Sequence, residues 1–452
     1  MNTVPSREDR GSVAYLFVVS GVAAVGGLLF GFDTAIIAGA IEFVRAEFNL
    51  TPLGEGFAVS SILVGCMIGA GVAGTISDRL GRKKVLIATA MLYVVSAVLA
   101  GVPRSLYELV AARFLGGLAV GVSSMVSPMY IAEIAPARIR GALVTLNQMA
   151  IVTGILLANV VSGLLVGVGP DNWRWMFASA ALPSLALLVA LLYVPESPRW
   201  LAKQGLLDPA LAILTKVGGR DSAAAELQEI RAALTQESGR FRDLFGPGLR
   251  VALATAVVLA ILGQISGINT VIYYAPKIFL RAGFAETASA TWANVLVGTT
   301  NFVATIISLL TIDYMGRKPL LLFGTAGMAA SMVLAGTCLT SGGVPTAAKV
   351  AIVLAYIACF GVGVGGVVWV VIAEIFPTKI RGRAASVATV SVWAACFVVA
   401  QTFPYLLERF GERVFFIYGI LSAAMFLFVL LVLTETRGKS LEEIEKAWMK
   451  RR

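Results

Sequence analysis

The sequence predicts an all-α membrane protein with twelve transmembrane helices in two parallel repeats of six. The first reason is composition: 58% of the 452 residues are hydrophobic and only 14% are charged, whereas a soluble domain carries about 25% charged residues. The second is a series of long apolar runs separated by short loops that contain charges, glycine or proline. The third is a pair of motifs that recur about half a chain length apart, which indicates an internal duplication.

Twelve apolar runs approach or exceed the length of about 20 residues that a helix needs to cross a bilayer. Because twelve is an even number, both termini lie on one side of the membrane, and each group of six spans enters from that side. The two groups are therefore parallel and related by an axis along the membrane normal. The predicted spans are residues 13–41, 55–77, 84–103, 106–131, 141–167, 175–195, 249–275, 288–312, 319–340, 347–373, 383–406 and 413–434.

Two motifs carry the evidence for duplication. AEIAPARIRG at residues 132–141 returns as AEIFPTKIRG at 373–382, and DRLGRK at 78–83 returns as DYMGRK at 313–318. The two pairs occur in the same order at offsets of 241 and 235 residues. Two matches at one period are unlikely to arise by chance, so the chain reads as two copies of one unit.

This period divides the chain into four parts. We expect an N-terminal six-helix half at 1–195, a linker at 196–248, a C-terminal six-helix half at 249–434 and a cytoplasmic tail at 435–452. The linker contains AAAELQEIRAAL, in which apolar residues recur every three to four positions. We therefore expect short amphipathic helices under the bundle rather than a separate catalytic domain.

Positive charge is unevenly placed. Of the 36 Lys and Arg residues, 27 lie at the termini and in the loops on their side, 8 lie on the opposite side and Arg113 lies within a span. By the positive-inside rule, both termini are cytoplasmic in a multi-pass plasma or inner membrane protein. The same placement accounts for the net charge of +10 without a nucleic-acid partner.

Several chemistries are excluded. The chain contains no histidine, which removes imidazole metal sites, Ser-His-Asp and Cys-His catalysis and histidine proton relays. The four cysteines lie inside apolar stretches without metal-ligand spacing. We therefore expect no metal, no cofactor and no enzyme activity, and any proton chemistry must fall to carboxylates.

Two ionisable residues lie well inside predicted spans. Asp33 is eight residues from the outer end of the first span, about 12 Å, and Arg113 is about seven residues from the outer end of the fourth, about 10 Å. Their depths match, so they can pair. One interpretation is a fixed ion pair that joins two helices; the other, which we favour, is a site whose proton affinity changes with conformation.

The motifs together resemble the sugar porter family of the major facilitator superfamily, and the resemblance runs essentially end to end. Within that family the chain looks most like the bacterial xylose/proton and glucose/proton symporters, whose proton-coupled members carry an Asp at the position of Asp33. The resembling stretches are GGLLFGFD (26–33), GTISDRLGRKK (74–84), PMYIAEIAPARIRG (128–141), NQ (147–148), VPESPRWL (194–201), QISGINTVIYYAP (264–276), DYMGRKPL (313–320), AEIFPTKIRG (373–382) and TETRGKSLEEIE (434–445).

The resemblance implies a major facilitator fold and alternating-access import of a pentose or hexose with a proton. It also implies a central substrate site made of amides, which bond sugar hydroxyls, and of aromatic rings, which cover sugar C–H faces. The candidates are Phe30, Gln148, Gln264, Asn269, Tyr273, Tyr274, Asn301, Trp369 and Trp393.

The C-terminal half departs from the family at several of these places. Gly263 replaces the first of two glutamines, Val392 replaces an amide before the tryptophan of the eleventh span, and Cys396 replaces another amide three residues after it. In the tenth span, Gly365-Gly366 stand where Gly-Pro is usual. These losses leave the sugar open: it can be smaller, less hydroxylated or differently oriented than the usual substrate.

The charged motifs at the predicted cytoplasmic helix ends form a candidate gate, in which acids and bases pair across the two halves in one state and separate in the other. The alternative is that these charges only set topology and reach the lipid headgroups. The gate candidates are Asp78, Arg82, Glu133, Arg140, Glu196, Arg199, Asp313, Arg317, Glu374 and Arg381.

Two other functions fit parts of this pattern. A proton-independent sugar facilitator or exchanger would use Asp33 only as a structural ion pair, and a non-transporting sugar sensor would be expected to carry a longer cytoplasmic tail. The expected partners are a monosaccharide, a proton and the lipid bilayer, with no nucleic acid, and we expect a monomer.

Overall fold

The computed structural model describes residues 11–136, 139–235, 241–246, 249–341, 343–376 and 380–437, and within these residues every regular element is a helix. The N-terminal half contains α1 (Val13–Ala35), α2 (Ile37–Glu47), α3 (Pro52–Leu80), α4 (Arg82–Gly101), α5 (Leu106–Ile134), α6 (Arg140–Leu165), α7 (Asn172–Ser179) and α8 (Ala181–Tyr193). Four short helices follow: α9 (Pro198–Lys203), α10 (Leu207–Gly218), α11 (Arg220–Thr235) and the 3₁₀ helix η1 (Phe241–Phe245).

The C-terminal half repeats the pattern. It contains α12 (Leu249–Ile265), α13 (Ile268–Ala282), α14 (Thr287–Met315), α15 (Arg317–Thr340), α16 (Thr346–Phe360), the π-helical turn η2 (Gly361–Gly365), α17 (Val367–Ile375), α18 (Arg381–Phe410), the 3₁₀ turn η3 (Gly411–Arg413) and α19 (Val414–Val432). Residues 438–452, which make up most of the predicted tail, lie outside the described part of the chain.

All twelve predicted spans are present. Within the described residues, eleven helical segments are long and apolar enough to cross a membrane, and the last of them, Gly382–Val432, contains both α18 and α19. Several spans are built from two helices: the first joins α1 and α2, and the tenth joins α16 and α17 through η2. The first span is longer than predicted because the helix continues past its apolar run to Glu47.

Local sequence explains where several helices begin and end. Thr51 caps α3 through its side-chain oxygen and is followed by Pro52, and Ser105 caps α5 in the same way. Gly81 and Gly316 end α3 and α14 with φ angles of 96° in both cases. A residue with a side chain rarely adopts this backbone conformation, so the glycine in each copy of the charged motif fixes the turn between two spans.

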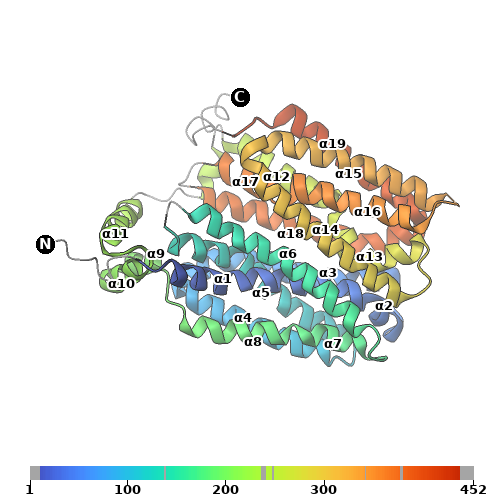
Figure 1. The fold of residues 1–452 in the computed structure, drawn as a ribbon, viewed down its shortest axis with the longest axis horizontal. Coiled ribbons are helices and arrows are strands. Elements are labelled where there is room, and N and C mark those ends of the chain that lie inside the picture. The colour runs from blue at the N-terminus through green and yellow to red at the C-terminus, as the bar shows by residue number, and fades with distance from the viewer. Residues whose placement is uncertain are drawn as a thin grey trace.

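The two halves lie side by side with their helices roughly parallel, in contact through α3 with α18 and α6 with α14 (Figure 1). At one end of the bundle, which we call the terminal end, Ser12 at the start of α1 donates its backbone N–H to Lys216 of α10 at 2.9 Å. Figure 1 shows α9, α10 and α11 at this end, and α2, α7 and the C-terminal part of α13 at the opposite, distal end. There α2 of one half packs on α13 of the other.

Candidate functional site

Asp33 of α1 and Arg113 of α5 lie in contact inside the N-terminal half. The Nη1 atom of Arg113 is 3.6 Å from Oδ1 of Asp33 and donates to the backbone carbonyl of Asp33 at 2.9 Å. Asp33 is 8% exposed and Arg113 is 1% exposed. The equal depths inferred from the sequence therefore correspond to a real ion pair. The role of this pair in proton coupling is a separate matter.

The pair is incompletely satisfied. Oδ2 of Asp33 and both Nε and Nη2 of Arg113 are buried without a hydrogen-bond partner among the described residues. The guanidinium lies 5.3 Å from the ring centroid of Phe177, which gives it a cation–π contact in place of further acceptors. Gly116 lets α5 approach this closely, because a Cβ there would lie 2.7 Å from Oδ2 of Asp33. The Asp33 carboxylate therefore makes one ion-pair contact, at 3.6 Å, and keeps one oxygen without a partner in the described structure.

An aromatic pair joins the two halves near Asp33. Phe30 lies one helical turn before Asp33 on α1, and its ring centroid is 5.4 Å from that of Trp393 on α18, with the planes tilted by 55°. Trp393 is 5% exposed, and its Nε1 atom is buried without a partner in the described part of the chain. Two of the predicted substrate residues therefore meet across the interface of the halves.

A polar cluster lies in the C-terminal half. The side-chain nitrogen of Asn269 donates to Oε1 of Gln264 at 2.7 Å and to the sulfur of Cys396 at 2.9 Å, and the Cys396 thiol donates to the same Oε1 at 3.1 Å. These residues come from three elements: Gln264 ends α12, Asn269 begins α13 and Cys396 lies on α18. The loss of an amide at Cys396 thus leaves a thiol that bonds to two predicted sugar ligands.

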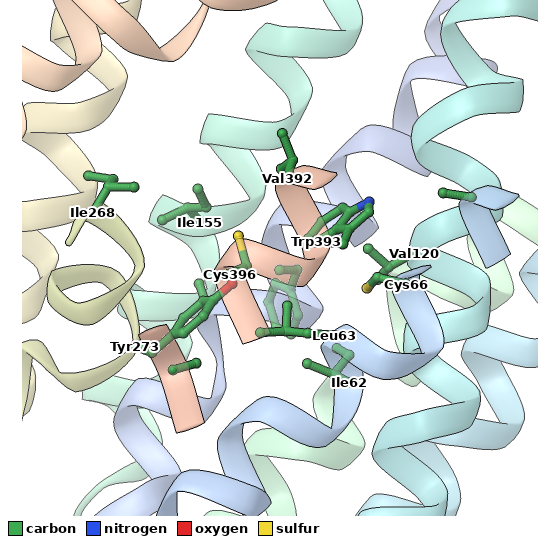
Figure 2. Close-up of a cluster of buried hydrophobic side chains, with 14 of the residues drawn as sticks. Ile62, Leu63, Cys66, Val120, Ile155, Ile268, Tyr273, Val392, Trp393 and Cys396 are labelled. Atoms are coloured by element: carbon green, nitrogen blue, oxygen red, sulfur yellow. The ribbon is translucent and has the colours of Figure 1, made fainter. Parts of the chain in front are cut away.

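The other substrate candidates are distributed unevenly. Tyr273 is 3% exposed and lies with Trp393 and Cys396 in one buried cluster, which Figure 2 shows. Tyr274 instead donates its hydroxyl to the backbone carbonyl of Ala400 at 2.8 Å, which ties α13 to α18 and indicates a structural contact. Asn301 is buried on α14, Gln148 is half-buried on α6, and Trp369 on α17 is 38% exposed.

Sequence reasoning missed a buried ion pair between the halves. Glu55 at the start of α3 is 1% exposed, and both of its oxygens accept hydrogen bonds from Nζ of Lys277 on α13, at 2.6 Å each. Arg45 lies 3.8 Å from the same carboxylate. Both residues fall at the edges of predicted spans, where charges usually contact water, so their burial gave no signal in the sequence.

Further polar contacts join the halves around this pair. Ser60 of α3 donates to Oε1 of Gln401 on α18 at 2.7 Å, and Nε2 of Gln401 donates to the carbonyl of Leu53 at 3.0 Å. On the other side of the interface, the side chain of Asn159 on α6 donates to the carbonyl of Asn294 on α14 at 3.1 Å, and Asn294 donates back at 3.0 Å. The distal part of the bundle is therefore bonded across the halves.

At the terminal end, the charged motifs pair within each half. Arg82 bonds both oxygens of Glu133 at 2.9 Å and contacts Asp78 at 3.0 Å. Glu196 accepts hydrogen bonds from the backbone N–H groups of Arg82 and Lys83 at the start of α4. Because a helix N-terminus carries unpaired N–H donors and a partial positive charge, this carboxylate caps the helix from another element.

The second copy repeats the arrangement. Arg317 bonds Glu374 at 2.8 Å and Asp313 at 3.1 Å. Glu435 accepts hydrogen bonds from the backbone N–H groups of Arg317 at 3.1 Å and Lys318 at 2.9 Å, at the start of α15. Glu435 was not among the predicted gate residues, although the paired dipeptides Glu196-Ser197 and Glu435-Thr436 are visible in the sequence.

Arg140 and Arg199 lie outside these two networks. Glu133 pairs with Arg82 rather than with Arg140, and Arg140 lies 3.7 Å from Glu226 of α11. Arg199 is exposed on α9, while Arg381 begins α18 and its side chain is outside the described part of the structure. Among the described residues, no ion pair joins the two halves at the terminal end.

Comparison with known proteins identifies the family. The family model described as "Sugar (and other) transporter" matches residues 19–448. The chain belongs to this family. The transporter has the predicted major facilitator fold, and it is not an enzyme.

Relatives and solved structures agree with this assignment. The arabinose-proton symporter of Bacillus subtilis (strain 168) is 40% identical over 451 residues, which cover 97% of the transporter and 96% of the relative. The xylose transporter XylE from E. coli, in a partially occluded inward open conformation, has a TM-score of 0.85 and 36% identity, covering 94% and 100% of the two chains. The proton:xylose symporter XylE bound to 6-bromo-6-deoxy-D-glucose has a TM-score of 0.79 and 36% identity, covering 96% and 99%.

The carboxylate that caps α15 makes the transporter's stability depend on pH. Partial burial raises the pKa of the Glu435 carboxyl, but hydrogen bonds from the backbone N–H groups of Arg437, Lys318, Arg317 and Thr436 outweigh it, so the pKa lies below its usual range. A lowered folded-state pKa stabilises the fold above the ordinary glutamate pKa of about 4.3, and this contribution is lost as pH falls through the folded-state value.

We expect Glu435→Gln to lower the thermal unfolding temperature of the purified transporter at pH 7, with a loss of about 1 kcal/mol, the usual size of a helix-capping contact. The difference from wild type should shrink as pH falls below about 4.3. Thermal unfolding in detergent between pH 3 and pH 8 measures it, with Glu408→Gln, an exposed acid on α18, as the matched control. A difference that is independent of pH would contradict this account of Glu435.

Proposed function

We propose that this transporter imports a monosaccharide, a pentose or a hexose, together with a proton across the cytoplasmic membrane by alternating access. The observation that carries the proposal is the placement of the Asp33–Arg113 pair, one helical turn from Phe30, which meets Trp393 of the other half. A proton-binding group and a substrate-facing ring are thus parts of one helix. The proton symport of arabinose and xylose by the relatives named above supports the same substrates here.

Protonation of Asp33 would act on the position of α1. The ionised carboxylate holds Arg113 of α5 at 3.6 Å, and protonation removes that attraction, while the Asp33 carbonyl keeps its hydrogen bond from Arg113. The α1 helix also carries Phe30 to the interface of the halves. A change of charge at Asp33 is therefore transmitted to the Phe30–Trp393 contact, where we place the sugar.

The arrangement of polar contacts supports an inward-facing state. The halves are bonded at the distal end through Glu55–Lys277, while the charged motifs at the terminal end pair within their own halves. The excess of Lys and Arg supports a cytoplasmic location for the terminal end, and α9, α10 and α11 would then lie beneath the bundle. Opening to the outside then requires the Glu55–Lys277 pair to separate, and the terminal clusters of the two halves would approach one another.

The alternative function is a facilitator or exchanger in which Asp33 only joins two helices. We expect Asp33→Asn to abolish sugar accumulation driven by an inward proton gradient, because an amide cannot exchange a proton, while sugar counterflow continues. Proteoliposome uptake with and without the gradient measures both activities. Asp208→Asn, an exposed acid on α10, serves as the control and should accumulate sugar like wild type. Gradient-driven accumulation by Asp33→Asn would show that Asp33 is not the coupling site. A wild-type protein that does not accumulate sugar under the gradient would favour the facilitator.

The Glu55–Lys277 pair should hold the two halves together at the distal end. We expect Lys277→Gln to populate the outward-open state, because it leaves Glu55 buried beside only the more distant Arg45, and breaking a buried pair costs about 3 kcal/mol. The distance between spin labels at Leu53→Cys and Ala285→Cys, both exposed at the distal end, should increase. Combining Lys277→Gln with Glu55→Gln should reverse part of the increase, because no unpaired charge remains.

Lys349→Gln on α16 is the matched control for that experiment, since it removes a lysine at the same end of the bundle without touching Glu55. Its label distances should equal those of wild type. Unchanged distances in Lys277→Gln would show that the pair does not hold the distal end closed.

A further inference from the structure

We propose that Cys396 is a positioning residue that restricts the transporter to sugars whose ring carries no hydroxymethyl group, namely aldopentoses and 6-deoxyhexoses. The proposal rests on the proposed function, since it concerns the sugar bound between Phe30, Trp393 and the amides of the C-terminal half.

The thiol consumes part of the hydrogen-bonding capacity of the two amides. An amide side chain offers two N–H donors and one carbonyl acceptor. The side-chain nitrogen of Asn269 donates to Gln264 and to Cys396. The side-chain carbonyl of Gln264 accepts from both Asn269 and Cys396. Only Oδ1 of Asn269 and the Nε2 group of Gln264 have no partner among the described residues.

These two free groups point to a ligand. Asn269 is 8% exposed, so its unpartnered Oδ1 belongs to a side chain that is more than nine-tenths buried. Oδ1 has no protein partner in the described part of the chain and is not fully enclosed, so a ligand or water can reach it and bond to it. One acceptor and one donor group can form hydrogen bonds with two hydroxyls on adjacent ring carbons. Pentoses and hexoses both carry such hydroxyls.

Apart from the two amides and the Tyr273 hydroxyl, several side chains around Cys396 are apolar (Figure 2). Val392 lies one helical turn before Cys396 on α18 and is 5% exposed, and Ile268 beside Asn269 is 2% exposed. Figure 2 shows both side chains with Ile155 and Tyr273 in the same buried cluster as Cys396. If the ring hydroxyls of a sugar bond to the free amide groups, the least polar edge of the ring faces the apolar side chains around Cys396.

Pentoses and hexoses of the same ring configuration differ at that edge. A pentopyranose has two hydrogens at the carbon next to the ring oxygen, a 6-deoxyhexose has a methyl group there, and a hexose has a hydroxymethyl group. Cys396 already occupies the Gln264 carbonyl and one Asn269 N–H, so neither group is left for the hydroxymethyl oxygen, which would exchange water for a mostly apolar wall. Discrimination of about 100-fold is typical where an apolar site meets one additional hydroxyl.

The experiment compares matched sugars. D-xylose, 6-deoxy-D-glucose and D-glucose share one hydroxyl configuration, and L-arabinose, 6-deoxy-D-galactose and D-galactose share another. Proteoliposome counterflow gives the half-saturation concentration for each sugar in wild type, Cys396→Ser, Cys396→Ala and Cys396→Asn. Cys338→Ser on α15, a thiol far from Asn269 in the chain and not bonded to it, is the matched control.

We expect wild type to bind the pentose and the 6-deoxyhexose at least about 10-fold more tightly than the hexose in one trio. Cys396→Ser should keep this ratio, because a hydroxyl makes the same bonds to Gln264 and Asn269. Cys396→Ala frees the two amide groups and Cys396→Asn adds a new amide, so both should reduce the ratio at least about 10-fold by improving hexose binding.

A merely structural role would weaken all sugars together and leave the ratio unchanged. The inference is overturned if Cys396→Ala and Cys396→Asn keep the wild-type ratio, or if wild type binds hexose and pentose equally. In either case only the inference about Cys396 is overturned, because sugar counterflow by the protein still supports the proposed function. Wild-type protein that exchanges none of the six sugars would overturn both.

Discussion

A charge buried inside a bundle of membrane helices must have a partner, and this requirement shapes the transporter. An unpaired carboxylate in such surroundings costs several kcal/mol. Asp33 and Glu55 are both less than a tenth exposed: Asp33 pairs with Arg113, and Glu55 pairs closely with Lys277 and less closely with Arg45. The first pair joins two helices of one half, whereas the second joins the halves themselves. A change of charge and a separation of the halves can thus occur at different places and remain linked through the rigid helices between them.

The two halves share the same charged network at the terminal end but differ in the polar residues of their interiors. Both halves build the same network at the terminal end, in which Glu196 and Glu435 cap the helices that follow the charged turns. Away from that end the halves have diverged: the N-terminal one carries Asp33 and Arg113, and the C-terminal one carries Gln264, Asn269 and the thiol between them. In the function proposed above, equal frames would let the two halves move as rigid bodies, while their unequal interiors would divide proton and sugar binding between them.

Much of the fold could be predicted because its signals are local. Apolar runs and repeated turns define the spans, and counting residues from a span end was enough to match Asp33 with Arg113. The tertiary contacts were harder. The sequence suggested acid–base pairs across the two halves, whereas Glu133 is bonded by Arg82 of its own half.

Residues that are adjacent in the sequence can also have different surroundings, which their spacing does not reveal. Tyr273 belongs to the central cluster, whereas Tyr274, with φ −125° and ψ 17° in a kink of α13, bonds the backbone of α18. Burial of Glu55 and Lys277 depends on how α3 meets α13, and the bonds of Cys396 depend on how α18 meets the break between α12 and α13. These are properties of packing between helices and leave no periodic trace in one sequence.

The π-helical turn at Gly361–Gly365 has a geometric consequence for the tenth span. A π turn accommodates one more residue than an α turn, and one residue of an α-helix corresponds to a rotation of about 100°. Every side chain of α17 is therefore turned about the helix axis relative to the direction that α16 alone would give it. The orientation of Trp369 is set in this way by a glycine-rich turn that precedes it, so a change in the length of that turn would rotate Trp369 and the other side chains of α17 about the helix axis.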